Sequence, residues 1–143
     1  MARALFASMI ATAVVSILMY LNVRMDFMPA FDILVDIARF NERLGLPFTT
    51  QAVWVTHGII GVVVLGSVFA IIEPVLPGRG AVQGMWFGVV TWLAMMVAFM
   101  PLAQHEIFAQ DLGAAFIAFA FALNLVYGAI LGMTYFAITS YDD

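Results

Sequence analysis

Four long apolar runs fill most of this 143-residue chain, at roughly residues 4–22, 52–73, 84–103 and 112–137. An α-helix needs about 20 apolar residues to cross the hydrocarbon core of a bilayer, and each run is close to that length. Four such helices and their connections use the whole chain. The sequence therefore predicts an all-α, four-helix transmembrane bundle that forms a single integral membrane domain over residues 1–143.

The composition agrees with a membrane location and excludes several kinds of chemistry. Hydrophobic residues make up 65% of the chain and charged residues 10%, whereas a soluble domain is about half apolar and a quarter charged. The chain has neither cysteine nor lysine, which excludes disulfides, thiolate nucleophiles and lysine Schiff bases. A net charge of −4 argues against a nucleic-acid partner. The partner that the composition predicts is the lipid bilayer.

The connection between the first two runs contains an amphipathic segment at about residues 31–44. Apolar and charged side chains would lie on opposite sides of this helix: Phe31, Leu34, Val35, Ile37 and Ala38 against Asp32, Asp36, Arg39 and Arg43. We expect an interfacial helix that lies at one mouth of the bundle.

Up-and-down threading would bring the only two histidines to the same end of the bundle. His57 is about six residues into the second run, and His105 follows the third, together with Glu106 and Asp111. Imidazole and carboxylate ligands suit zinc, iron or manganese. One hypothesis is therefore a transition-metal site made of His57, His105, Glu106 and Asp111. The alternative is that these are ordinary polar residues at a bilayer surface, since no histidine or glutamate pair shares one helix face.

A related hypothesis is a b-type haem held by His57 and Met100. Such a haem needs two axial ligands that face each other, commonly two histidines or a histidine and a methionine. His105 would lie too far out, beyond Pro101, so Met100 would replace it. A histidine at this depth could equally hold a chlorophyll-type pigment or donate a hydrogen bond to a neighbour.

Small residues recur at every fourth position in three of the runs. They include Ala4, Ser8, Thr12 and Ser16 in the first run, Gly80, Gly84 and Gly88 before and within the third, and Gly128 and Gly132 in the fourth. Such ladders let helices approach closely. They exceed what one bundle needs, so we expect some of them to face a second copy or another subunit.

Asn124 is the most polar residue at mid-depth, and Tyr127 lies one turn further along. A buried amide needs partners on another helix, and the polar stripe of the first run could supply them. Contact with a quinone or another small substrate is the alternative. No charged residue lies at the centre of a run, which argues against an ion-coupled transporter.

Short motifs along the chain resemble those of a known family. They are Ala11-Thr12 with Ser16 and Met19, Phe31-Asp32, Trp54 with His57 and Gly61, Gly84 with Gly88 and Trp92, Met100-Pro101-Leu102 with Phe108, and Tyr127-Gly128. This pattern resembles small four-helix bacterial inner-membrane proteins that are catalogued as a domain of unknown function. The resemblance implies a fold and a bacterial inner-membrane location, and no established activity.

These observations predict a non-enzymatic membrane subunit, accessory to a larger complex or associated with copies of itself. The first alternative is a haem- or metal-binding redox protein that uses the histidines near one membrane face. The second alternative is a transporter of small molecules or lipids.

Overall fold

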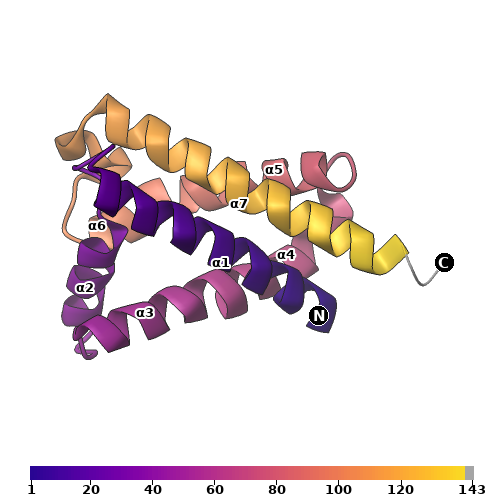
Figure 1. The fold of residues 1–143 in the computed structure, drawn as a ribbon, viewed down its shortest axis with the longest axis horizontal. Helices are drawn as coiled ribbons and strands as arrows, with labels where there is room; N and C mark the ends of the chain where they lie inside the picture. Colours follow the sequence, from indigo (N-terminus) through magenta and orange to yellow (C-terminus); the bar gives the residue numbers. More distant parts are fainter. Residues whose placement is uncertain (141–143) are drawn as a thin grey trace.

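The computed structural model describes residues 1–140, and this range is helical without strands. Four helical segments are long and apolar enough to cross a membrane: Ala2–Met25 (α1), Thr50–Val75 (span two), Ala81–Leu102 (span three) and Ala114–Ser140 (α7). The start of α1 and the end of α7 lie at the same end of the bundle (Figure 1). The predicted four-helix fold is confirmed. The last helix begins at residue 114, and not 112, because Gly113 leaves the helical conformation with φ 86°.

The two middle spans are each interrupted by a wider π-helical turn. Span two consists of α3 (Thr50–Gly58), the π turn η1 (Ile59–Val64), α4 (Leu65–Ile72) and the 3-10 turn η2 (Glu73–Val75). Span three consists of α5 (Ala81–Ala94), the π turn η3 (Met95–Phe99) and α6 (Met100–Leu102). Pro101 lacks an amide hydrogen and its ring crowds the preceding turn, which accounts for the irregular turn before it. π turns are rare and occur frequently at functional sites.

The small-residue ladders hold the helices of this one chain together. A methyl group on Gly84 would overlap the carbonyl group of Gly128, so α5 and α7 are in backbone contact. Ser8 packs in the same way on Gly66 of span two, and Ala4 and Ser8 are completely buried. The expectation that some ladders face another subunit is therefore wrong at these positions, because the chain itself occupies the faces that they leave open.

The predicted amphipathic helix is α2 (Ile33–Arg43), and it runs across the end of the bundle that is remote from the termini (Figure 1). Asp32 caps its first turn by accepting a hydrogen bond from the Val35 amide at 3.4 Å. The faces of α2 differ from the prediction: Val35 is 45% exposed, whereas Asp36 is only 4% exposed. The apolar face contains Ile33, Ile37 and Phe40. The charge of Asp36 predicts a place on the solvent face, but the Asp36 carboxylate pairs with the buried side chain of His105.

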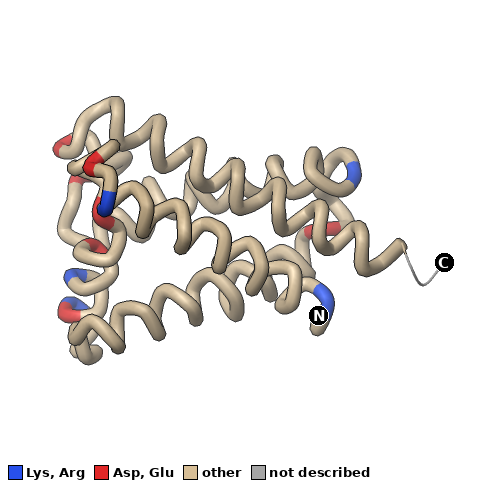
Figure 2. The backbone as a smooth tube through the Cα atoms, in the orientation of Figure 1, with Lys and Arg blue, Asp and Glu red and all other residues tan. Residues whose placement is uncertain are grey.

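Charged residues gather at the two ends of the bundle and leave an uncharged belt between them (Figure 2). One end contains the termini and the link between spans two and three. The other contains α2 and the link before α7, which includes the 3-10 turn η4 (Ile107–Leu112). This distribution is consistent with a multi-pass integral membrane protein whose exposed apolar side chains contact lipid.

Candidate functional site

Spans two and three make aromatic contacts near the termini but enclose a cavity further along the bundle. Phe69 of α4 packs on Phe87 of α5 with ring centroids 5.1 Å apart, and on Tyr135 of α7 at 5.3 Å. Beyond these rings the space between the two spans forms a cavity of about 310 Å³. Ala94 and Ala98 line it and are exposed, so the cavity is open at this side of span three.

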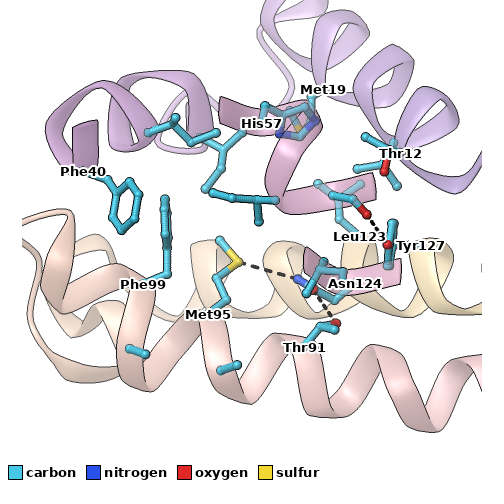
Figure 3. A pocket seen from close by; sticks show the side chains of 18 of the residues that line it. Thr12, Met19, Phe40, His57, Thr91, Met95, Phe99, Leu123, Asn124 and Tyr127 are labelled. Carbon is cyan, nitrogen blue, oxygen red and sulfur yellow. Dashed lines mark hydrogen bonds between the residues drawn. The ribbon is translucent and has the colours of Figure 1, made fainter. Parts of the chain in front are cut away.

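The cavity wall is almost entirely apolar and contains no charged side chain within residues 1–140. Its polar side chains are Thr12, His57, Thr91, Asn124 and Tyr127 (Figure 3). Both π turns contribute to the wall, through Ile60 and Gly61 of η1 and through Met95, Ala98 and Phe99 of η3. The departures from regular α-helix in spans two and three therefore coincide with the cavity.

A carbonyl group in the first π turn joins three helices at the inner end of the cavity. The Gly61 carbonyl accepts hydrogen bonds from the hydroxyl of Ser8 at 2.6 Å and from that of Tyr127 at 2.7 Å. The two hydroxyl oxygens are themselves 2.5 Å apart. The Thr12 hydroxyl packs on Gly61 and has no hydrogen-bond partner within the described range. α1, span two and α7 are thus fixed to one another here.

His57 lines the cavity from span two, and its ring nitrogen Nε2 lies beside the Ser16 hydroxyl. The Ser16 hydroxyl donates to the Thr12 carbonyl at 2.7 Å and lies 3.0 Å from Nε2 of His57. A hydroxyl group has one proton, so both contacts are hydrogen bonds when Nε2 of the imidazole donates to Ser16. Nδ1 of the neutral ring then keeps a lone pair. None of the hydrogen bonds found in residues 1–140 involves this atom.

Asn124 lies on the opposite wall, on α7. Its side-chain oxygen accepts a hydrogen bond from Thr91 at 2.9 Å, and its side-chain nitrogen donates to the Ala120 carbonyl at 2.8 Å. The second amide hydrogen has only the sulfur of Met95, at 3.6 Å (Figure 3). The expected partner stripe on α1 is wrong, because close packing of α5 on α7 brings Thr91 nearer.

α2 covers the end of the cavity with its apolar face, where Phe40 packs on Phe99 with ring centroids 5.4 Å apart. Its polar face is fixed by the His105 cluster, which we define as Asp36, His105 and Asp111. Nε2 of His105 is 2.8 Å from the Asp36 carboxylate, and Nδ1 is 2.5 Å from that of Asp111. The cluster therefore joins α2 to the link before α7.

The charges of this cluster favour an imidazolium ion. Burial opposes protonation of His105, but the hydrogen bonds and charges of Asp111 and Asp36 outweigh it, so the pKa of His105 is raised above 6.5. Desolvation works against the ionised form of Asp111, yet the hydrogen bond from His105 and that from the Glu106 amide lower the pKa of Asp111 below 3.8. Burial raises the pKa of Asp36, while His105 and Arg39 oppose that rise.

The residues predicted as metal or haem ligands are divided between three places. His57 lies in the cavity wall, whereas Met100 is completely buried and does not line the cavity. His105 and Asp111 are paired, and Glu106 joins them through its backbone amide, at 3.0 Å from Asp111. Among the described residues no three His, Asp or Glu side chains are arranged to hold a metal ion. The haem and metal hypotheses stay predictions without an assembled ligand set.

Sequence reasoning missed several residues of the cavity and of the His105 cluster. Ser16 appeared only as part of a small-residue stripe, Asp36 only as part of a polar face, and Thr91 and Met95 not at all. The topology does place Asp36 at the same end of the bundle as His105, and this could have predicted that the two side chains pair. Nothing in the local sequence marks Thr91 as the partner of Asn124.

Comparison with known proteins assigns the chain to a family. A protein-family model described as a family of unknown function (DUF6789) matches residues 1–143. The chain belongs to this family. The match confirms the resemblance to a small membrane-protein family of unknown function. No curated protein matches the chain, and no solved structure does either. Membership of this family implies no activity, so the cavity is the main evidence about function.

Proposed function

We propose that this protein binds a neutral, lipophilic small molecule within the membrane, in the cavity between spans two and three. The observation that carries the proposal is an apolar cavity of about 310 Å³ that lies between two π turns. Ligand sites are typically concave, mostly apolar and about 300–1,000 Å³ in volume, with a few polar groups that fix orientation. This is the small-molecule or lipid alternative of the sequence analysis, restricted to binding.

The absence of charge in the cavity wall restricts the class of ligand. Removing an ion from water costs several kcal/mol unless an opposite charge or several hydrogen bonds compensate. The wall contains no charged side chain within the part of the chain that the structure describes, and Asn124 and Tyr127 already form hydrogen bonds within the protein. Fatty-acid anions, phospholipid headgroups and metal ions are therefore poor occupants. A neutral molecule that already partitions into the bilayer is a good one, and the sideways opening at Ala94 and Ala98 would admit it from lipid.

The test is retention of a neutral lipid through purification, with two matched variants. Ala98→Phe adds a ring inside the cavity, whereas Val97→Phe adds the same ring at a neighbouring side chain that is 52% exposed and outside the lining. Solvent extracts of protein purified in mild detergent are analysed by mass spectrometry. We expect a stoichiometric neutral compound with the wild type and Val97→Phe, and its loss with Ala98→Phe. Equal extracts from all three proteins would refute the proposal.

The role of accessory subunit and the location in a bacterial inner membrane stay predictions. The main argument for a partner was a surplus of small-residue ladders, and contacts within the chain account for those named above. A ligand-binding protein can still associate with others. Co-purification from native membranes in mild detergent tests both predictions together with the ligand.

A further inference from the structure

We infer that the ligand is a lipid-soluble aromatic diol, a hydroquinone (quinol) or a related bisphenol, that donates a hydrogen bond to Nδ1 of His57. The inference rests on the proposed function and specifies the substrate class of the same cavity. Two polar side chains carry it, His57 and Asn124, which lie on opposite walls of the cavity (Figure 3).

His57 presents a hydrogen-bond acceptor to the ligand. The Ser16 hydroxyl donates its hydrogen bond to the Thr12 carbonyl, so in the arrangement that satisfies both contacts the imidazole donates from Nε2 and keeps a lone pair on Nδ1. Within residues 1–140 the fully covered side-chain N and O atoms that lack a partner are Thr12 Oγ1, Asn41 Oδ1 and Trp92 Nε1, and Nδ1 of His57 is not among them. Nδ1 therefore has neither a partner nor a complete cover of protein atoms. A group that binds to it has to supply a proton.

Asn124, on the opposite wall, presents a hydrogen-bond donor. One of its amide hydrogens is directed at the sulfur of Met95 at 3.6 Å, and a thioether is a weak acceptor. A ligand oxygen would be a better partner for this N–H group. The cavity thus presents an acceptor on one wall and a donor on the other, which suits a molecule with an oxygen at each end of a compact skeleton.

The carbon skeleton of the ligand should be aromatic. Phe40 and Phe99 form a pair of rings at the α2 end of the cavity, and Phe31 also lines it. Aromatic groups gain from such neighbours beyond the area they bury. A phenol is also a stronger proton donor than an aliphatic alcohol, because its pKa is about 10.

The inference predicts a preference between three closely related molecules. A hydroquinone can donate to His57, whereas its dimethyl ether and the oxidised quinone cannot, since both offer only acceptors to Nδ1. One neutral hydrogen bond corresponds to a factor of about 3 to 10 in affinity. The quinone has the same ring as the hydroquinone, so shape alone would not separate these two.

The experiment is a competition in mild detergent under anaerobic conditions, with an alkyl hydroquinone and its dimethyl ether added in equal amounts. Native mass spectrometry counts the two bound forms on the same protein. We expect the wild type to favour the hydroquinone by about 3- to 10-fold. His57→Phe keeps the ring but removes the acceptor, so it should bind both compounds without preference. Ser16→Ala frees the tautomer and should reduce the preference.

The outcomes separate this inference from the proposed function. Equal binding of both compounds to the wild type, lost in Ala98→Phe, would refute the diol class and leave the cavity as a binding site. A preference that survives in His57→Phe would also refute it, because the acceptor would lie elsewhere. If neither compound binds and no neutral lipid co-purifies, the proposed function fails as well. Circular dichroism shows whether each variant is folded. If His57→Phe does not fold, the preference of Ser16→Ala between the two compounds tests the role of His57 instead.

Discussion

The backbone contact between α5 and α7 at Gly84 allows a quantitative prediction about stability. Gly84 of α5 lies against α7, where an added Cβ would be 2.7 Å from the Gly128 carbonyl carbon and 2.8 Å from the Gly132 amide nitrogen. Both neighbours are backbone atoms, which cannot rotate away as a side chain can. We therefore expect Gly84→Ala to push α5 and α7 apart by about 1 Å, since ordinary carbon contacts lie near 3.5–4.0 Å.

The cost follows from the contacts that such a separation weakens. A gap of about 0.5–1 Å forfeits a quarter to a half of each contact energy, and one buried leucine makes about 40–60 contacts of 0.1–0.2 kcal/mol each. Contacts equal in number to those of one buried leucine would then lose about 1–6 kcal/mol, and overpacking usually costs about 1–3 kcal/mol, so we expect a loss of about 2–3 kcal/mol. The hydrogen bond from Thr91 to Asn124, now 2.9 Å long, would stretch as well.

The matched control is Gly58→Ala. Gly58 is also helical, with φ −62° and ψ −43°, but nothing lies within 4 Å of its added Cβ. Alanine there should be neutral or stabilising by up to about 1 kcal/mol, because glycine is the poorer helix former. Unfolding of both variants by sodium dodecyl sulfate in mixed micelles, followed by circular dichroism, gives the comparison. Equal stabilities of Gly84→Ala and Gly58→Ala would refute the close packing of α5 on α7.

Two further predictions concern the hydrogen-bond networks. The hydrogen bonds that raise the pKa of His105 stabilise the docking of α2 fully below pH 6.5, and this contribution should disappear as the pH rises through the raised value. Protection of the α2 amides against hydrogen exchange measures this loss, and His105→Asn should remove it at a cost of about 1 kcal/mol; protection that is independent of pH would contradict this. At the Gly61 carbonyl, Tyr127→Phe leaves Ser8 as a donor and should cost about 0.6 kcal/mol. The double variant with Ser8→Ala leaves the carbonyl unpaired, so its cost should exceed the sum of the single costs.

The fold could be predicted because run length and hydropathy act at the level of whole helices. An apolar run of about 20 residues has few alternatives to a membrane-spanning helix, and α2 follows from the alternation of charged and apolar residues. Threading of four spans also placed His105 and Asp111 at the α2 end. These predictions need no knowledge of which residues are in contact.

The details of the site could not be predicted because they depend on which helix faces which. A ladder such as that of Gly84 has the same sequence whether its partner is α7 or another chain. The partner of Asn124 depends on the resulting distance between α5 and α7. The π turn at Ile59–Val64 has no proline to announce it, although Pro101 gave a signal for the one at Met95–Phe99. The cavity results from the helix pairing and the two π turns together, so no single sequence feature predicts it.

The position of the cavity has a simple explanation in where the small residues lie. Span two approaches α1 through Gly61 and Gly66, and span three approaches α7 through Gly84. The interface between spans two and three has no such ladder in close contact, and Phe69 and Phe87 hold it apart. On this interface the small side chains of Ala94 and Ala98 line the cavity and are exposed, whereas the small residues of the other ladders are in contact with a neighbouring helix. The ladders that hold spans two and three to their neighbours lie on other faces, so larger residues at these two positions would fill the cavity and leave those contacts in place.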